Sequence, residues 1–384
     1  MNKKAIKVAS MSTLSLVLVC LISACGASTS QPGEPQQQAV TAPNKSKADD
    51  WNAIVKAAQE EGTVNCGCPP RPDFTKILKE GFEAAYPGIT LEATPATLPE
   101  FPLRVVNEQQ AGKYLWDVYM FGPGPEIFEL KNKGNLEPFL DYVTLPEVLD
   151  GSVYEGGLQS AFLDTDKKYI FSMWWHANSI GVNRNMFSDD GIDSFDDLYD
   201  PKYKGKIVWV DPRGGGSGSS YAAFVLSKYG KDGLKKILVD QEAMLVKGNV
   251  EAAEQLIRGG KGISIPDISY DAFVQYEKAG VKTNIAATQK LKDLSFTSVG
   301  GSSPAVFKEP PHPNATKVFL NWVLSKEGQT LISEKLKNNS RRKDVPVANP
   351  ALQPIPGVEY FNSHSEEGAK LQREAATIAK QLIP

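Results

Sequence analysis

Residues 196–218 read DDLYDPKYKGKIVWVDPRGGGSG, and this stretch sets the pattern of the fold. The segment from Lys206 to Val210 predicts a buried strand, because β-branched and aromatic residues favour extended backbone. Arg213 and the glycine-rich residues after it then lead into a helix over about 221–229. A strand, a glycine-rich turn and a helix in this order are typical of α/β proteins, whose ligands lie beyond the carboxyl ends of strands.

The chain before this stretch alternates strands and helices. Strands are expected at Thr63–Cys68, Ile89–Ala93 and Leu115–Phe121, and the segments between them carry apolar residues at helical spacing. Short connections between alternating elements imply a parallel, doubly wound sheet. The Cys-Gly-Cys-Pro-Pro-Arg turn and the Gly-Pro-Gly-Pro turn then fall at the ligand-binding edge of that sheet.

A second lobe with the same alternation follows, beginning with an extended segment at Tyr169–Val182. Thr297–Phe307 is expected to return the chain to the first lobe, where Asn314 caps a long helix with an apolar stripe. Two such crossovers form a hinge about which two lobes close on a ligand. The predicted division places residues 49–172 and 302–384 in lobe 1 and residues 173–301 in lobe 2.

The first 25 residues predict export. Three lysines near the start precede an apolar run at Leu14–Ile22, which is too short to span a bilayer permanently, and two small residues come just before Cys25. This order resembles the lipobox of bacterial lipoproteins. Residues 1–24 are therefore expected to be a signal peptide and Cys25 to carry a lipid. The alternative is an ordinary cleaved signal with an incidental cysteine.

Residues 25–48 are rich in Gln, Pro, Ser, Thr and Ala and offer almost nothing to bury, so they predict a disordered tether. Removal of the signal takes away three lysines and no acids, and the formal net charge changes from −3 to −6. This mild acidity argues against a nucleic-acid or anionic-membrane partner for the folded body. The predicted location is the outer side of the cell membrane, facing the periplasm or the exterior.

Two cysteines remain beyond the lipid site, at Cys66 and Cys68. An oxidising compartment permits a disulfide between them, although a bridge across one residue strains its geometry. The alternative is a pair of small residues at the end of a strand. A soft-metal site would need more thiolate or imidazole ligands nearby. The histidines, His176, His312 and His364, are dispersed, and no nucleophile–base set stands out. The sequence therefore predicts neither an enzyme nor a cofactor.

The chain resembles a known family over nearly the whole body. Residues 196–218 resemble the central motif of extracellular solute-binding proteins (family 1) of ABC importers for iron, thiamine, phosphonates and sugar phosphates. KVFLNWVLSKEGQTLISE at 317–334 resembles their C-terminal helix pair, and SRRKDV at 340–345 resembles the segment after it. EGFEAAYPGITLE at 80–92 resembles their first helix–strand passage. The resemblance implies a type II periplasmic-binding-protein fold that hands a small solute to an ABC permease, and we predict a monomer.

The glycine-rich stretch at 214–218 predicts where the solute binds. A helix that opens there leaves backbone N–H groups without partners, and its dipole favours an anion. Arg213 adds a fork that suits phosphate or carboxylate, and the serines add hydroxyl donors. The alternative is a flexible loop with an ordinary helix cap. A nucleotide P-loop is excluded, because no Gly-Lys-Ser/Thr follows.

Two further groups of residues complete the predicted site. In an extended segment Trp174 and His176 share one side, where they stack on or hydrogen-bond a solute; core packing is the alternative. Asp267 and Tyr270 follow a strand at a position where the resemblance implies ligand contacts. The full set of predicted solute contacts is Arg71, Gly122, Gly124, Trp174, His176, Arg213, Gly214, Gly215, Gly216, Ser217, Gly218, Ser219, Asp267, Tyr270, Ser302 and Ser303.

The sequence thus predicts a lipid-anchored solute-binding protein of an ABC importer that captures a small polar anion between its lobes. Two alternatives stay open. The iron-binding branch of the family carries adjacent tyrosines, whereas Tyr270 and Tyr276 are six residues apart here. A polyamine binder would instead line its cleft with Asp211, Asp267 and Asp271.

Overall fold

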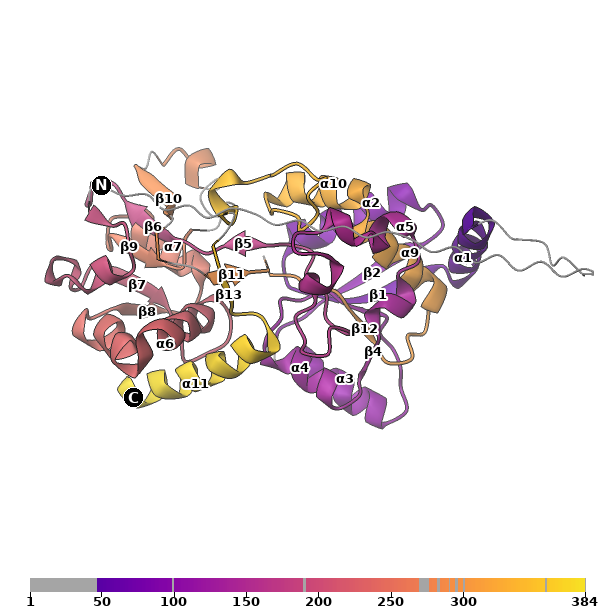
Figure 1. The fold of residues 1–384 in the computed structure, drawn as a ribbon, viewed down its shortest axis with the longest axis horizontal. Helices are drawn as coiled ribbons and strands as arrows, with labels where there is room; N and C mark the ends of the chain where they lie inside the picture. The colour runs from indigo at the N-terminus through magenta and orange to yellow at the C-terminus, as the bar shows by residue number, and fades with distance from the viewer. Residues whose placement is uncertain are drawn as a thin grey trace, which may run out of the picture. The chain divides into compact units, whose positions relative to one another are not determined.

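A computed structural model describes residues 47–383, except 99, 189–190, 269–275, 282–283, 290, 294–295, 300 and 356–357. The predictions for the signal peptide, the tether before residue 47, Cys25 and Tyr270 lie outside these residues. The described part has a mixed α/β fold built on two five-stranded sheets and a smaller three-stranded one (Figure 1).

The first sheet has the strand order β2-β1-β3-β12-β4. Its strands are β1 (Thr63–Cys68), β2 (Thr90–Pro95), β3 (Val118–Tyr119), β4 (Leu136–Glu137) and β12 (Ala305–Phe307). β1 pairs in parallel with β2 and β3, as the strand–helix alternation predicted, whereas β12 runs antiparallel to β3 and β4. The predicted return of the chain to the first sheet is therefore confirmed.

The helices of this half are α1 (Lys47–Glu61), α2 (Pro72–Ala85), α3 (Glu100–Gln110), α4 (Pro125–Asn132), α5 (Pro146–Leu149), α9 (Pro313–Leu324) and α10 (Lys326–Leu336). The prediction that Asn314 caps α9 is wrong. Pro313 occupies the first turn and the cap is His312, because proline is suited to the first position of a helix. The Asn314 side chain donates instead to Glu61 Oε1 at 2.7 Å.

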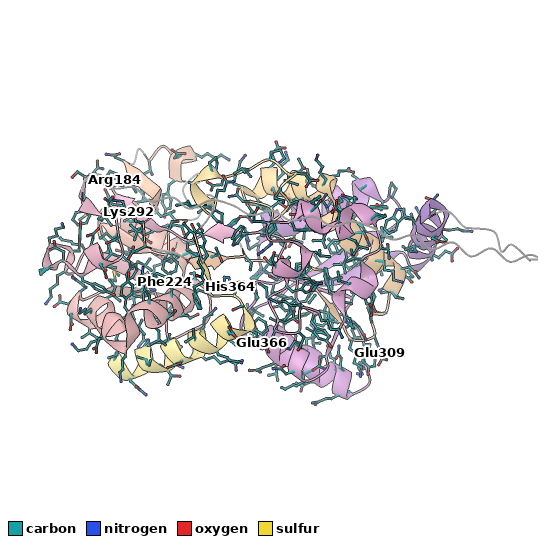
Figure 2. All side chains as sticks on the ribbon, in the orientation of Figure 1. Arg184, Phe224, Lys292, Glu309, His364 and Glu366 are labelled. Carbon is teal, nitrogen blue, oxygen red and sulfur yellow. A yellow bond between two sulfur atoms is a disulfide. The ribbon has the colours of Figure 1, made fainter. Side chains whose placement is uncertain are left out.

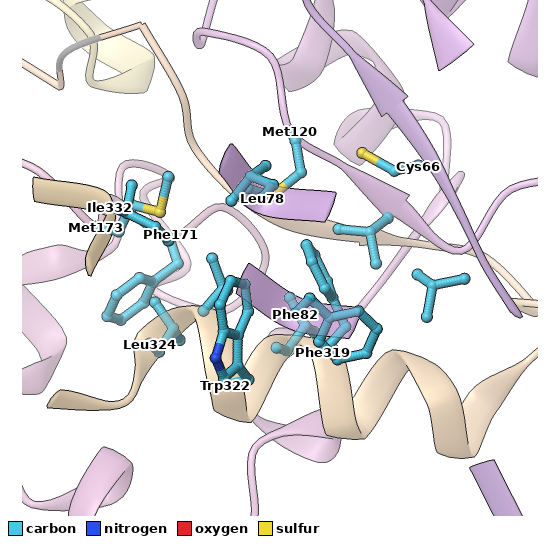
Figure 3. Packing of buried hydrophobic residues seen from close by; sticks show 14 of the residues in the cluster. Cys66, Leu78, Phe82, Met120, Phe171, Met173, Phe319, Trp322, Leu324 and Ile332 are labelled. Atoms are coloured by element: carbon cyan, nitrogen blue, oxygen red, sulfur yellow. The ribbon is translucent and has the colours of Figure 1, made fainter. Parts of the chain in front are cut away.

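Aromatic packing joins α2 to α9 beneath this sheet (Figure 3). The ring centroids of Phe82 and Phe319 lie 5.2 Å apart with planes at 89°, and Trp322 lies 5.6 Å from Phe82. Edge-to-face contacts of this kind stabilise a core beyond the area they bury. They fix α2, and with it the Pro-Pro-Arg turn that precedes the helix.

The second sheet has the strand order β10-β6-β9-β7-β8. Its strands are β6 (Ile180–Asn183), β7 (Ile207–Val210), β8 (Met244–Val246), β9 (Ile263–Ile265) and β10 (Ile285–Gln289), and helices α6 (Ser217–Lys235) and α7 (Asn249–Ile257) lie beside it. β7 is parallel to β8 and β9. The stretch at 196–218 thus forms a strand and the start of a helix, as predicted.

Three short strands connect the two halves. β5 (His176–Ala177) leads into the second sheet and β11 (Phe296–Ser298) leads out of it, and the two pair antiparallel. These are the two predicted crossovers. A third strand, β13 (Phe361–Asn362), pairs in parallel with β11 and brings the C-terminal segment into the same sheet.

The C-terminal helix α11 (Glu366–Leu382) runs alongside α6 (Figure 1). Ala375 and Ala379 are buried in the same apolar cluster as Trp209 and Phe224 of the second half. Ser365 caps the helix by accepting a hydrogen bond from the Gly368 N–H at 3.0 Å. The division into lobes stays a proposal, and this packing favours grouping residues 366–382 with the second sheet.

Cys66 and Cys68 form a disulfide with a Cα–Cα distance of 5.8 Å, and both side chains are fully buried. The bridge closes a loop of three residues, for which the chain-entropy relation gives about 1.5 kcal/mol of stabilisation.

We expect reduction of the Cys66–Cys68 disulfide to lower the free energy of unfolding by about that amount. Urea titrations of the oxidised and reduced body from Ser46 onward, in which these are the sole cysteines, measure it. A loss above about 3 kcal/mol would contradict a purely local role.

Candidate functional site

The start of α6 lies directly against the end of β7. A methyl group on Gly218 would stand 2.0 Å from the Val210 carbonyl oxygen, so glycine alone fits this contact. Gly216 caps the helix with φ 95°, a left-handed conformation that also favours glycine. Gly214 and Gly215 face open space. The glycine-rich stretch therefore presents the amino end of a long helix at the carboxyl end of a strand, as the sequence predicted.

The serines of this turn bond within the protein. Ser217 Oγ lies 2.8 Å from Asn249 Oδ1. Ser219 Oγ lies 2.9 Å from the Gly216 carbonyl oxygen and 3.1 Å from Gln372 Oε1 of α11. Because Ser219 is buried and held from two sides, it fixes the position of α11 beside the helix start.

Arg213 is engaged by two internal acceptors. Its Nε and Nη2 donate to both carboxylate oxygens of Asp211 at 2.8–3.2 Å, and its Nη1 donates to the Ile383 carbonyl oxygen at 3.1 Å. The hydrogen bond from Arg213 lowers the pKa of Asp211. The guanidinium therefore ties the end of α11 to the turn after β7, and most of its donors are already used.

A pocket of about 180 Å³ opens beside this turn. Three segments line it: the first turns of α4, the glycine-rich turn, and the middle of α11. The lining residues are Pro125, Glu126, Glu129, Gly214, Gly215, Ser219, Gln372, Arg373 and Ala376. Of the predicted contacts it holds Gly214, Gly215 and Ser219, and Gly124 is the cap of α4 beside it.

Sequence reasoning did not find the α4 and α11 residues of this pocket. A signal for α11 was available in Ser365 followed by Glu366 and Glu367, since a serine cap with acids in the first turn is a helix-start pattern. For α4 the helix begins inside the Gly-Pro-Gly-Pro turn itself, with Pro125 at its first position. Proline and glycine residues are common both in turns and at helix starts, and the sequence predicted only a turn here.

Four predicted residues gather at the carboxyl edge of the first sheet. Arg71 Nη1 lies 3.6 Å from the point where a Cβ on Gly301 would stand, and a Cβ on Gly122 would touch the Gly301 backbone at 3.4 Å. The Ser303 N–H donates to the Phe121 carbonyl oxygen at 2.8 Å. Ser302 Oγ donates to the Met120 carbonyl oxygen at 2.8 Å, which uses its hydroxyl inside the sheet.

Trp174 and His176 lie in the interior. Trp174 is fully buried, with its ring centroid 6.1 Å from that of Phe74. His176 Nε2 accepts a hydrogen bond from the Asn339 N–H at 2.8 Å, and burial lowers the pKa of His176 to about 4. Core packing, the alternative for this pair, is what the structure shows. Trp175, on the other side of the segment, is only partly buried and packs under the Arg341 guanidinium at 5.3 Å.

Asp267 follows β9, and its N–H donates to the Ser179 carbonyl oxygen at 3.1 Å. The Tyr221 hydroxyl contacts the same carbonyl group, so α6, β9 and the segment after β5 meet here. Burial raises the pKa of Tyr221 well above its usual value. Tyr276, the second tyrosine considered as an iron ligand, packs against the apolar cluster of Ala253, Leu256 and Ile268.

Across the part of the chain that the structure describes, no three His, Cys, Asp or Glu side chains gather in a way that would hold a metal ion. Among those same residues, no helix combines the length and apolar character needed to cross a bilayer.

Known proteins share this fold. The chain superposes with TM-score 0.66 on iron-bound HitA from Pseudomonas aeruginosa, at 18% identity, over 84% of this chain and 99% of that one. A ferric binding protein from Campylobacter jejuni gives TM-score 0.66, 18% identity and coverage of 83% and 99%. AfuA from Actinobacillus pleuropneumoniae, with fructose-6-phosphate bound, gives 0.58, 16% and coverage of 84% and 97%. These likenesses place the fold among the type II periplasmic binding proteins.

Two sequence comparisons bear on the family. The chain is 25% identical over 197 residues to an uncharacterized protein of Haemophilus influenzae, and the match spans 48% of this chain and 55% of that protein. The family model of the bacterial extracellular solute-binding proteins matches residues 78–353, which is more than half of the chain. The chain belongs to the bacterial extracellular solute-binding proteins.

Proposed function

We propose that this protein is the solute-binding component of an ABC importer, held at the outer face of the membrane by a lipid on Cys25. It captures a small polar anion between its lobes and delivers it to a permease by hinge closure. The family membership supports the general role. The observation that carries the ligand class is the pocket at the amino end of α6, where Gly214 and Gly215 leave open space beside a helix dipole.

The substitution Gly215→Asp tests this proposal, because it places a negative charge in the pocket. The site has room for a side chain, so we expect folding to be kept and anion binding to weaken at least tenfold. Gly248→Asp is the control, since Gly248 faces open space as Gly215 does, but it caps α7 and is not among the residues that line the pocket. Isothermal titration of both variants with the anion that the thermal-shift panel identifies measures the change in affinity. Unchanged binding by Gly215→Asp would contradict the proposal.

The solute is identified by measuring the thermal shift that each member of a panel causes. The panel contains sugar phosphates, phosphonates, carboxylates, polyamines, thiamine and ferric iron. A solute at 100 times its dissociation constant stabilises the folded state by about 2.7 kcal/mol, which raises the melting temperature by a few degrees. A shift with iron alone, accompanied by visible colour, would favour the second candidate function. That candidate is ferric-ion binding, which is suggested by the shared fold of iron-bound HitA and of the ferric binding protein from Campylobacter jejuni.

A further inference from the structure

The pocket between α4, α6 and α11 carries side-chain charges of both signs. We propose that its solute is a zwitterion, with an acid group held by Arg373 and the glycine-rich turn and an ammonium group held by Glu126. This inference rests on the proposed function, and it names the solute class of that same pocket.

Arg373 supplies the cationic wall of the pocket. Its two hydrogen bonds both use Nη2, which donates to Glu129 Oε1 at 2.6 Å and to the Pro125 carbonyl oxygen at 3.1 Å. Within the described residues Nε and Nη1 make no hydrogen bond, and they are left for a ligand. A guanidinium anchored through one nitrogen is held in place for an acid group, because its planar fork is already oriented. Arg213 lacks this capacity, since Asp211 and Ile383 engage three of its nitrogens.

Glu126 supplies the anionic wall. Its carboxylate lies against Gly124, with Oε2 2.3 Å from the point where a Cβ on that glycine would stand. Across the described residues no ion pair includes Glu126, whereas Glu129 is paired with Arg373. The pocket therefore keeps one unmatched negative charge after its internal pair is formed. A solute that is only anionic would lie close to this carboxylate, and the repulsion is reduced if the same solute brings an ammonium group.

Gln372 gives the pocket a fixed polar surface between these charges. Its Nε2 donates to the Ser363 carbonyl oxygen at 2.6 Å, and its Oε1 lies 3.1 Å from Ser219 Oγ. Both ends of the buried amide are thus held. Side chains locked in this way recognise a short, compact solute by the distance between its two charged groups.

Matched probes separate the two charges. We would titrate the full-length mature protein with O-phosphoethanolamine and β-alanine, and with the same molecules lacking the amine, ethyl phosphate and propionate. At least one zwitterion is expected to bind tenfold or more tightly than its partner without the amine. Glu126→Gln should abolish that difference. Arg373→Gln should weaken the zwitterion and its partner alike by at least tenfold. Glu374→Gln, at an exposed neighbouring position of α11, should change neither affinity.

Three outcomes would overturn the inference. Equal binding of each zwitterion and its amine-free partner would remove the role of Glu126 and leave the anion proposal standing. Failure of all four probes, while another anion of the wider panel binds and responds to Gly215→Asp, would likewise reject the zwitterion and keep the proposed function. Silence of every solute in both experiments would reject both.

Discussion

Replacing Glu366 with glutamine is expected to lower the free energy of unfolding by about 3 kcal/mol. Glu366 Oε2 lies 2.7 Å from Lys131 Nζ of α4, and the two side chains are only 10% and 6% exposed. The same oxygen accepts hydrogen bonds from the Thr165 N–H at 3.0 Å and from Thr165 Oγ1 at 2.8 Å. Removing one partner of a buried pair leaves the other charge poorly compensated, which typically costs about 3–5 kcal/mol. Asp166, which also contacts Lys131, keeps the loss near the lower value.

Urea unfolding of the variant measures this loss, and Glu367→Gln, at the exposed next position, is the control. The control should stay within about 0.5 kcal/mol of the parent protein. A combined Lys131→Met and Glu366→Leu variant should recover most of the stability, because apolar residues often replace a buried ion pair at little cost. If the two glutamine variants lose the same stability, the buried ion pair of Lys131 and Glu366 does not hold the start of α11 to α4. Figure 2 labels Glu366 at the start of α11.

The acid dependence of the same pair follows from its pKa. Burial alone would raise the pKa of Glu366, but the hydrogen bonds from Lys131 and Thr165 outweigh it and lower the pKa from 4.5 to about 2. A carboxyl group with a lowered pKa stabilises the folded state fully above its unfolded value. The contribution of Glu366 is therefore complete above pH 4.5 and is lost as the pH falls towards 2.

The elements that the sequence predicted correctly are those whose burial pattern is local. Strand β1 was predicted at the residues where it lies, Thr63–Cys68, because a short apolar segment between two helical patterns has few other readings. Helix α6 was predicted too short, since its first turn consists of glycine and serine, which have weak helix propensity. There the backbone is set by the contact of Gly218 with Val210, a tertiary feature that propensity does not record.

The sequence predicts the backbone of the candidate site, but it does not predict which charged side chains line the site or which distant residues they contact. The position of the glycine-rich turn follows from the strand–turn–helix order alone. The contact of Arg213 with the Ile383 carbonyl oxygen does not, because Ile383 is 170 residues further along the chain and reaches Arg213 only through the packing of α11 on α6. Arg373 could not be placed for the same reason. Trp174 and His176 share one side of an extended segment, but alternation does not tell which side faces the core.

The folded state is expected to lose about 3 kcal/mol of stability through His176 alone as the pH falls from 6.5 to 4. Burial lowers the pKa of this histidine from 6.5 to about 4. Between these values the unfolded chain binds a proton that the folded chain does not, so stability falls with falling pH and is fully present above 6.5. Protonation would also place a second N–H against the Asn339 N–H, whose acceptor is His176 Nε2.

His176→Gln tests this titration, because the glutamine oxygen is able to accept the Asn339 N–H and carries no proton of its own. The measurement is the difference in unfolding free energy between pH 7.5 and pH 4 for each protein, so any constant cost of the substitution cancels. The variant should show a decline about 3 kcal/mol smaller than that of the parent. An identical decline in the two proteins would mean that the pKa of His176 is the same in the folded and unfolded states, which would contradict the prediction. Because His176 lies in β5, which crosses between the two main sheets, and bonds to the segment after α10, its protonation is expected to weaken the junction between those sheets.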